Sequence, residues 1–83
     1  MVIKRSVTVY GTSVCLWCHR TREFLREQHI PFKDIDVSTN ARAAAEMIKK
    51  SGQQGVPVIN VNGELIIGFD EQRLRKALHL RAS

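Results

Sequence analysis

The sequence predicts one α/β domain, in which three helices pack on a mixed four-stranded sheet in the order β-α-β-α-β-β-α. Two periodicities and one turn predict this fold class. Short stretches of alternating polar and apolar residues indicate strands, whereas longer stretches with apolar residues three and four positions apart indicate helices. The dipeptide Asn62-Gly63 predicts a tight hairpin between the last two strands, because both positions tolerate positive φ.

The first half of the chain predicts a strand, a helix and a second strand. Ser6–Tyr10 and Phe32–Val37 alternate as strands do, and Leu16–Gln28 between them has helical spacing that Pro31 ends. The expected inward face of this helix consists of Thr21, Phe24, Leu25 and Gln28. Charged residues are expected on its solvated sides, namely Arg22, Glu23, Arg26 and Glu27. Arg20 and Arg22 lie within two turns of Cys15 and have a second interpretation, in which they add positive potential at the cysteines, but the solvated face is favoured.

The second half predicts a helix, two strands and a last helix. Asn40 is expected to cap a helix over Ala41–Lys50, with Gly52 just past its end. The remaining elements are strands over Val56–Val61 and Glu64–Ile67, and a helix that Asp70 opens and that ends near Leu80. The residues expected to face inward are Ala44, Met47 and Ile48 on the first of these helices and Leu74, Ala77 and Leu78 on the second. Strands joined by a helix are expected to run parallel, and the last pair, joined by two residues, antiparallel.

The composition indicates a small globular protein with a modest basic excess. The chain has 83 residues, of which 43% are hydrophobic and 25% charged, and its formal net charge is +5. Basic residues are spread along the chain without a block of five like charges, so nucleic-acid binding is not indicated. The apolar stretch after Lys4-Arg5 is too short for a secretory signal, and no apolar run has the length of a membrane span. We therefore expect a cytoplasmic protein without a membrane segment. We also expect a monomer.

Cys15 and Cys18 are the candidate catalytic residues. Because the cytosol keeps thiols reduced, two cysteines at this spacing indicate redox or metal chemistry rather than a structural disulfide. Cys15 is expected where a helix begins, and the free N–H groups and partial positive charge there stabilise a thiolate. Cys18 follows one turn later on nearly the same face. The spacing therefore predicts that Cys15 attacks a substrate disulfide and that Cys18 resolves the mixed disulfide.

The same segment has three other interpretations. With His19 it matches the haem attachment motif C-x-x-C-H, but haem attachment needs export and a mostly helical chain. A structural zinc site needs four ligands, and the three histidines show no paired spacing. An iron–sulfur cluster shared by two chains through Cys15, with small thiols completing the coordination, stays open. His19 is expected to face solvent, and we expect neither a metal nor a tightly bound cofactor.

Three segments in register resemble the glutaredoxin family, the minimal form of the thioredoxin fold. They are Cys15–Cys18 after the first strand, Val56-Pro57 before the third, and Gly68-Phe69-Asp70 at the start of the last helix. The resemblance covers nearly the whole chain and implies a single glutaredoxin-like domain over residues 1–83. It implies a dithiol–disulfide oxidoreductase that reduces protein disulfides or glutathione mixed disulfides, with glutathione as co-substrate.

The resemblance also implies roles for the substrate-facing residues. The bond between Val56 and Pro57 would be cis, and the Val56 backbone would pair with an extended substrate. The backbone of Phe69, after Gly68, and the side chain of Asp70 would hold the γ-glutamyl end of glutathione. The pair Gly68-Phe69 is also similar to redoxins that serve ribonucleotide reductase and are recharged by thioredoxin reductase, so the electron donor stays open.

The chain departs from the glutaredoxin pattern at several positions. Leu16 and Trp17 stand where many glutaredoxins have proline and tyrosine. Thr12 stands where many have a basic residue that pairs with a glutathione carboxylate, and Gln53 and Gln54 occupy the region of a second one. Without these contacts we expect weaker glutathione binding. Trp17 either packs on the domain or forms an exposed platform beside the sulfurs.

Overall fold

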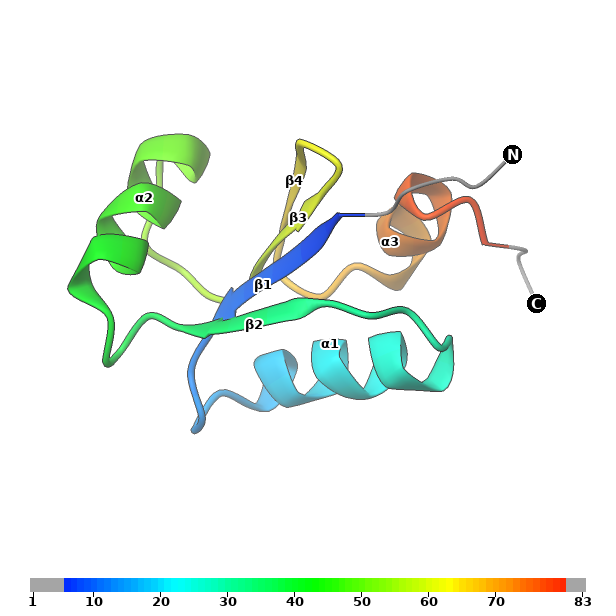
Figure 1. Ribbon diagram of the computed structural model, residues 1–83. Coiled ribbons are helices and arrows are strands. Elements are labelled where there is room, and N and C mark those ends of the chain that lie inside the picture. Colours follow the sequence, from blue (N-terminus) through cyan, green and yellow to red (C-terminus); the bar gives the residue numbers. More distant parts are fainter. Residues whose placement is uncertain (1–5, 81–83) are drawn as a thin grey trace.

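The computed structural model describes residues 6–80 and has the predicted elements in the predicted order (Figure 1). The strands are β1 (Val7–Gly11), β2 (Lys33–Asp36), β3 (Val58–Val61) and β4 (Glu64–Ile67). The helices are α1 (Leu16–Glu27), α2 (Ala41–Ser51) and α3 (Glu71–Ala77). The predicted fold class, a minimal thioredoxin fold with three helices on a four-stranded mixed sheet, is confirmed.

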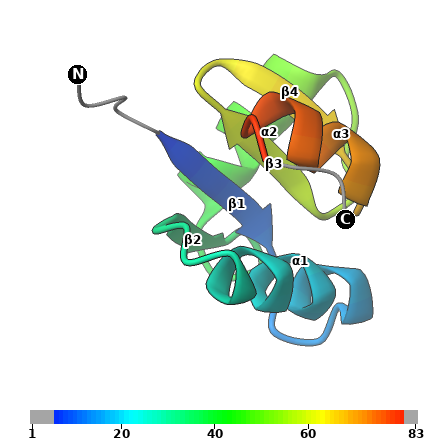
Figure 2. The same ribbon diagram turned by 90° about the vertical axis from the view of Figure 1, so that its right-hand side faces the viewer.

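The strand order is β2-β1-β3-β4, so β1 lies inside the sheet, between β2 and the β3–β4 hairpin (Figure 2). β1 and β2 run parallel, with Thr8 opposite Lys33, as expected for strands joined by a helix. β3 runs antiparallel to β1, and β4 antiparallel to β3. The expected parallel direction is therefore wrong for β2 and β3. These strands lie on opposite sides of β1 and run in opposite directions, and the crossover rule concerns parallel strands only, so it does not apply to the connection through α2.

Different helices cover the two faces of the sheet. The core shared with α1 and α3 on one face consists of Val7, Val9, Phe24, Leu25, Ile30, Ile59, Val61, Ile66, Leu74 and Leu78. A smaller core under α2 on the other face consists of Tyr10, Ala43, Met47 and Val58. Full burial of one such aliphatic side chain stabilises the fold by about 1.5–3 kcal/mol. The larger cluster, which lies against α1, is therefore the main source of stability.

Side chains and left-handed residues fix the helix ends. Asn40 and Asp70 cap α2 and α3 as predicted, and each side chain accepts a hydrogen bond from a backbone N–H three residues later. The last helix ends at Ala77 rather than near Leu80, because His79 has a φ of 58° and the chain turns back on itself there. The Leu80 N–H then donates to the carbonyl of Arg75 at 2.8 Å, which is the helix-terminating bond of a Schellman motif.

The strand limits differ from the prediction by one or two residues. β1 is displaced by one residue and extends to Gly11, and β2 is one residue shorter at each end than Phe32–Val37. β3 begins at Val58 instead of Val56, because Pro57 has no N–H to donate to a neighbouring strand. The Asn62-Gly63 hairpin is confirmed, with φ values of 52° and 97°.

One residue of α2 faces the wrong way in the prediction. Met47 is buried as expected, but Ile48 is 38% exposed, and Ala43 takes the inward position instead. Positions 43 and 47 are four residues apart and share one stripe of the helix, whereas residue 48 lies at its margin.

No helix within residues 6–80 is long and apolar enough to span a membrane.

The adjacent residues Met47 and Ile48 provide a matched test of this packing. We expect Met47→Ala to lower the free energy of unfolding by about 2–5 kcal/mol, since it leaves a cavity under α2. Ile48→Ala, which trims a partly exposed side chain, should cost less than about 1 kcal/mol. Urea unfolding followed by circular dichroism measures both, and equal losses would contradict the described orientation of α2.

Candidate active site

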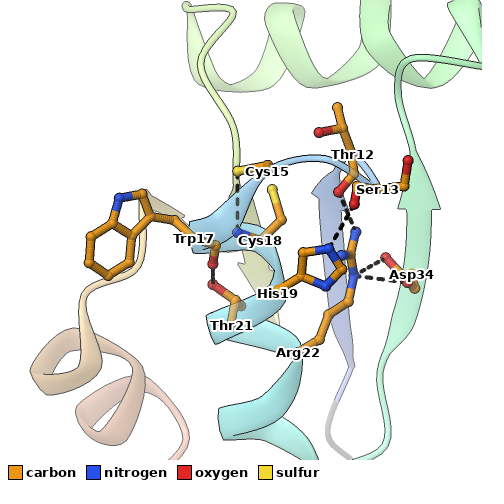
Figure 3. Close-up of polar contacts among 9 residues, drawn as sticks. All are labelled: Thr12, Ser13, Cys15, Trp17, Cys18, His19, Thr21, Arg22 and Asp34. Carbon is orange, nitrogen blue, oxygen red and sulfur yellow. Dashed lines mark hydrogen bonds and ion pairs between the residues drawn. The ribbon is translucent and has the colours of Figure 1, made fainter.

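Cys15 occupies the N-cap position of α1. Its backbone is extended, with φ −87° and ψ 119°, and its Sγ accepts a hydrogen bond of 3.3 Å from the backbone N–H of Cys18 (Figure 3). The Cys15 side chain is half-buried, whereas Cys18 is fully buried in the first turn of the helix. The sequence predicted this start of the helix, and the structure confirms it.

The two thiols differ in acidity. Burial raises the pKa of Cys15, but hydrogen bonds from Cys18 and from the Trp17 backbone, together with the positive charge of Arg22, outweigh burial and leave this pKa below its usual value. Burial and the hydrogen bond to Cys15 raise the pKa of Cys18 to about 11. The arrangement therefore favours a thiolate at Cys15 and a protonated thiol at Cys18.

Arg22 is buried, so the prediction that it faces solvent is wrong. Its side chain is 8% exposed, and Nε lies 3.0 Å from Oδ2 and 3.1 Å from Oδ1 of Asp34 on β2. Nη2 donates a hydrogen bond of 3.2 Å to the carbonyl of Thr12 (Figure 3). A buried guanidinium needs such partners, and Asp34 and Thr12 supply them. The i, i+4 spacing from Cys18 to Arg22 was the one sequence signal that placed both on the same helix face.

Gly11 ends β1 directly behind the cysteine pair. A Cβ at this position would lie 2.7 Å from Sγ of Cys18 and 3.2 Å from Nη2 of Arg22. The missing side chain therefore leaves the space that both groups occupy. No sequence pattern marks Gly11 or Asp34 as part of this site, because only the folded sheet brings them beside the helix.

An apolar groove lies beside Trp17, which stands between the two cysteines in the sequence. Five of the predicted substrate-binding residues line a cavity of about 260 Å³, namely Trp17, Val56, Pro57, Gly68 and Phe69. The Val56–Pro57 bond is cis, as the family resemblance implied. The Gly68 N–H donates a hydrogen bond of 2.8 Å to the Pro57 carbonyl and so joins two of the segments that line the groove.

Trp17 is partly exposed and also packs on the domain, so both of the predicted alternatives apply to it. The side chain is 55% exposed, yet its ring stacks on Phe69 with 6.2 Å between centroids. Phe69 in turn meets Phe24 of the core edge-on at 6.0 Å. In Figure 3, Trp17 points to the side of α1 opposite Arg22 and Asp34. An aromatic wall supported by the core thus flanks the cysteines on one side, and an ion pair flanks them on the other.

The other predicted binding residues are not among those that line the groove. Asp70 is exposed and caps α3, where Oδ1 accepts a hydrogen bond of 3.1 Å from the Arg73 N–H. The side-chain amide of Gln53 bonds both backbone polar groups of Gly55, at 2.9 Å and 2.6 Å. Thr12 is half-buried, and its carbonyl accepts the bond from Arg22.

His19 is exposed, as expected, and its Nε2 lies 2.7 Å from the Ser13 carbonyl. Within residues 6–80, no three His, Cys, Asp or Glu side chains are grouped so that they could hold a metal ion.

A C-x-x-C pair at the start of the first helix of a thioredoxin fold defines the class of thiol–disulfide oxidoreductases. The Glutaredoxin family model matches residues 7–66. A glutaredoxin-like 8.6 kDa protein of the rubredoxin operon of Clostridium pasteurianum is 38% identical over 87% of this chain and 96% of its own length. Glutaredoxin 3 of Escherichia coli is 33% identical over 80% of both chains. The crystal structure of a glutaredoxin from Archaeoglobus fulgidus superposes with a TM-score of 0.81, at 27% identity over 87% of this chain and 84% of that one.

This chain therefore belongs to the glutaredoxin family, whose members are thiol–disulfide oxidoreductases.

The unequal acidities predict selective alkylation of the reduced protein. At neutral pH iodoacetamide should modify Cys15 alone, because its lowered pKa provides thiolate while Cys18, with a pKa of about 11, stays protonated and buried. Peptide mass mapping identifies the modified residue, and the rate against pH should show a midpoint below that of an ordinary thiol. Equal modification of both cysteines at pH 7 would contradict the assignment.

Proposed function

We propose that this chain reduces protein disulfides and glutathione mixed disulfides with Cys15 as nucleophile and Cys18 as resolving thiol. The observation that carries this proposal is the hydrogen bond from the Cys18 N–H to the Cys15 sulfur at the start of α1. It stabilises negative charge on the more exposed of the two sulfurs.

Two exchange steps follow from this arrangement. The Cys15 thiolate attacks one sulfur of the substrate disulfide, and the other sulfur leaves as a thiolate that takes up a proton from water. Cys18 then loses its proton and attacks the Cys15 sulfur of the mixed disulfide. The Cys15–Cys18 bond forms, the second substrate thiol leaves, and two electrons have passed from the dithiol to the substrate.

The apolar groove is the proposed binding site for the substrate segment next to the disulfide. Main-chain groups at Val56 pair with an extended chain, and the Trp17–Phe69 wall contacts its side chains. For glutathione, the γ-glutamyl end would lie against the backbone of Phe69 and the carboxylate of Asp70. The protein acts as a monomeric cytoplasmic domain without a bound cofactor, and its partners are disulfide-containing proteins and its electron donor.

Glutathione is proposed to be a weak donor. Thr12 brings no positive charge to the site, and the amide of Gln53 is already bonded within its own loop. Charge-assisted bonds to the two glutathione carboxylates would each contribute about 1–3 kcal/mol. Their absence favours recharging by thioredoxin reductase.

Cysteine variants test the mechanism. Cys15→Ser should abolish reduction of a protein disulfide, because no other thiol lies at the exposed position. Cys18→Ser should still attack but stop at the mixed disulfide, which mass spectrometry detects as an adduct of the substrate thiol. If Cys18→Ser prevents formation of the adduct, the two roles are reversed.

Anaerobic purification tests the iron–sulfur alternative. A colourless protein with turnover supports the proposal. A brown dimer without turnover on any disulfide would overturn it in favour of a cluster-binding module.

A donor comparison tests the glutathione proposal. With NADPH in excess, turnover should be higher with thioredoxin reductase than with glutathione and its reductase. Thr12→Lys should lower the KM for glutathione by roughly 5–30-fold, since it restores one charge-assisted contact. Ala45→Lys adds the same charge on the exposed side of α2 and should leave this KM unchanged. Strong glutathione turnover by the unmodified protein would contradict the proposal.

A further inference from the structure

Arg22 and the sulfur of Cys18 are close neighbours in the interior. Both lie near the point where a Cβ of Gly11 would stand, Sγ at 2.7 Å and Nη2 at 3.2 Å. Since these two distances sum to 5.9 Å, the sulfur and the guanidinium nitrogen can be no further apart than that. Cys18 has no exposed surface and Arg22 only 7%, so water screens this pair little.

Asp34 holds the guanidinium at this place. It contacts Nε through both carboxylate oxygens, at 3.0 Å and 3.1 Å, while Nη2 is left to face Thr12 and the end of β1. The Asp34 side chain is 43% exposed, so water weakens its own field at the sulfur, whereas Arg22 acts from inside. The pair therefore leaves a net positive influence at Cys18.

We propose that Arg22, held by Asp34, is a positioning residue that stabilises the Cys18 thiolate in the resolving step. The inference rests on the proposed two-cysteine mechanism and deepens it. In that step Cys18 loses its proton to water and attacks the Cys15 sulfur, the Cys15–Cys18 bond forms, and the bond from Cys15 to the substrate sulfur breaks. The substrate leaves as a thiolate and takes up a proton.

The resolving step needs such help because Cys18 is otherwise a poor nucleophile. Burial and the hydrogen bond to Cys15 raise its pKa to about 11, whereas the backbone of Thr12 and the positive charge of Arg22 act in the opposite direction. The groups around Cys18 are Cys15 and Arg22 on α1 and the Thr12 backbone after β1. Asp34 and Asp36 on β2 face Arg22, and His19 lies on the exposed side of α1. Once Cys15 is in a mixed disulfide it carries no charge, so Arg22 is the cation that then faces the sulfur.

Dipyridyl disulfide, a neutral reagent, separates the two steps. Attack by Cys15 releases one thiopyridone, and resolution by Cys18 releases a second, so stopped-flow absorbance records both in one trace. Arg22→Gln should slow the second release about tenfold at neutral pH and move its pH midpoint up by about one unit, because an opposite charge within about 6 Å shifts a pKa by that order. The first release should change less than about threefold, because the hydrogen bonds from Cys18 and the Trp17 backbone still lower the pKa of Cys15 when Arg22 is replaced.

Further variants keep the test decisive. Arg22→Lys keeps the charge and should restore the second release to within about threefold of the unmodified protein. Arg22→Met is a second neutral variant in case glutamine disturbs folding, which circular dichroism reports. Arg26→Gln removes the same charge from an exposed position one turn later and should leave both releases unchanged.

Three results would overturn the inference. The neutral variants of Arg22 could leave the second release within twofold of the unmodified protein, or they could slow both releases equally. Alternatively, Arg26→Gln could slow the second release as much as Arg22→Gln does. Absence of the first release in the unmodified protein would instead refute the proposed function itself.

Discussion

The hydrogen bond from the Cys18 N–H to the Cys15 sulfur serves both the fold and the chemistry of this protein, because it caps helix α1 and stabilises negative charge on the sulfur. The first N–H groups of a helix have no partner within the helix, so a side chain must accept from them or water must. Here the accepting atom is a sulfur, and a negative sulfur accepts better than a neutral one. The interaction that starts α1 is thus the same one that stabilises a thiolate at Cys15. A serine at this position would cap the helix equally well and leave the site without redox chemistry.

The sheet brings the rest of the site to that helix start. β3 runs antiparallel to β1, with Tyr10 opposite Val58, and β4 runs antiparallel to β3, with Val58 opposite Ile67. The end of β1, the start of β3 and the end of β4 therefore lie at one edge of the sheet. The turn that contains Cys15 continues from the end of β1, Pro57 directly precedes β3, and Gly68 directly follows β4. The bond between Gly68 N–H and the Pro57 carbonyl then fixes the last two against each other.

Features that depend on local sequence could be predicted. The Asn40 and Asp70 caps, the Asn62-Gly63 turn and the helix start at Cys15 each follow from a few adjacent residues, and each is found in the structure. Burial of Arg22 could not be predicted, because it depends on a carboxylate from β2, twelve residues further along the chain. The direction of β3 was also beyond the sequence pattern, since it depends on which strand becomes its neighbour. Local sequence therefore predicted that Cys15 lies at the start of a helix. The ion pair between Arg22 and Asp34 depends on tertiary structure and could not be predicted in this way.

The effect of the Arg22–Asp34 ion pair on the thiols explains its presence better than a contribution to stability does. Replacing such a pair with apolar residues of similar volume is often neutral or stabilising, because desolvation offsets most of the attraction between the charges. Asp34 is also partly exposed, which weakens the pair further as a source of stability. A guanidinium in this place nevertheless does something that an aliphatic side chain does not, since it presents a fixed positive charge to a sulfur that is closed off from water. Gly11 supports the same interpretation, because a Cβ at this position would crowd both the sulfur and the guanidinium.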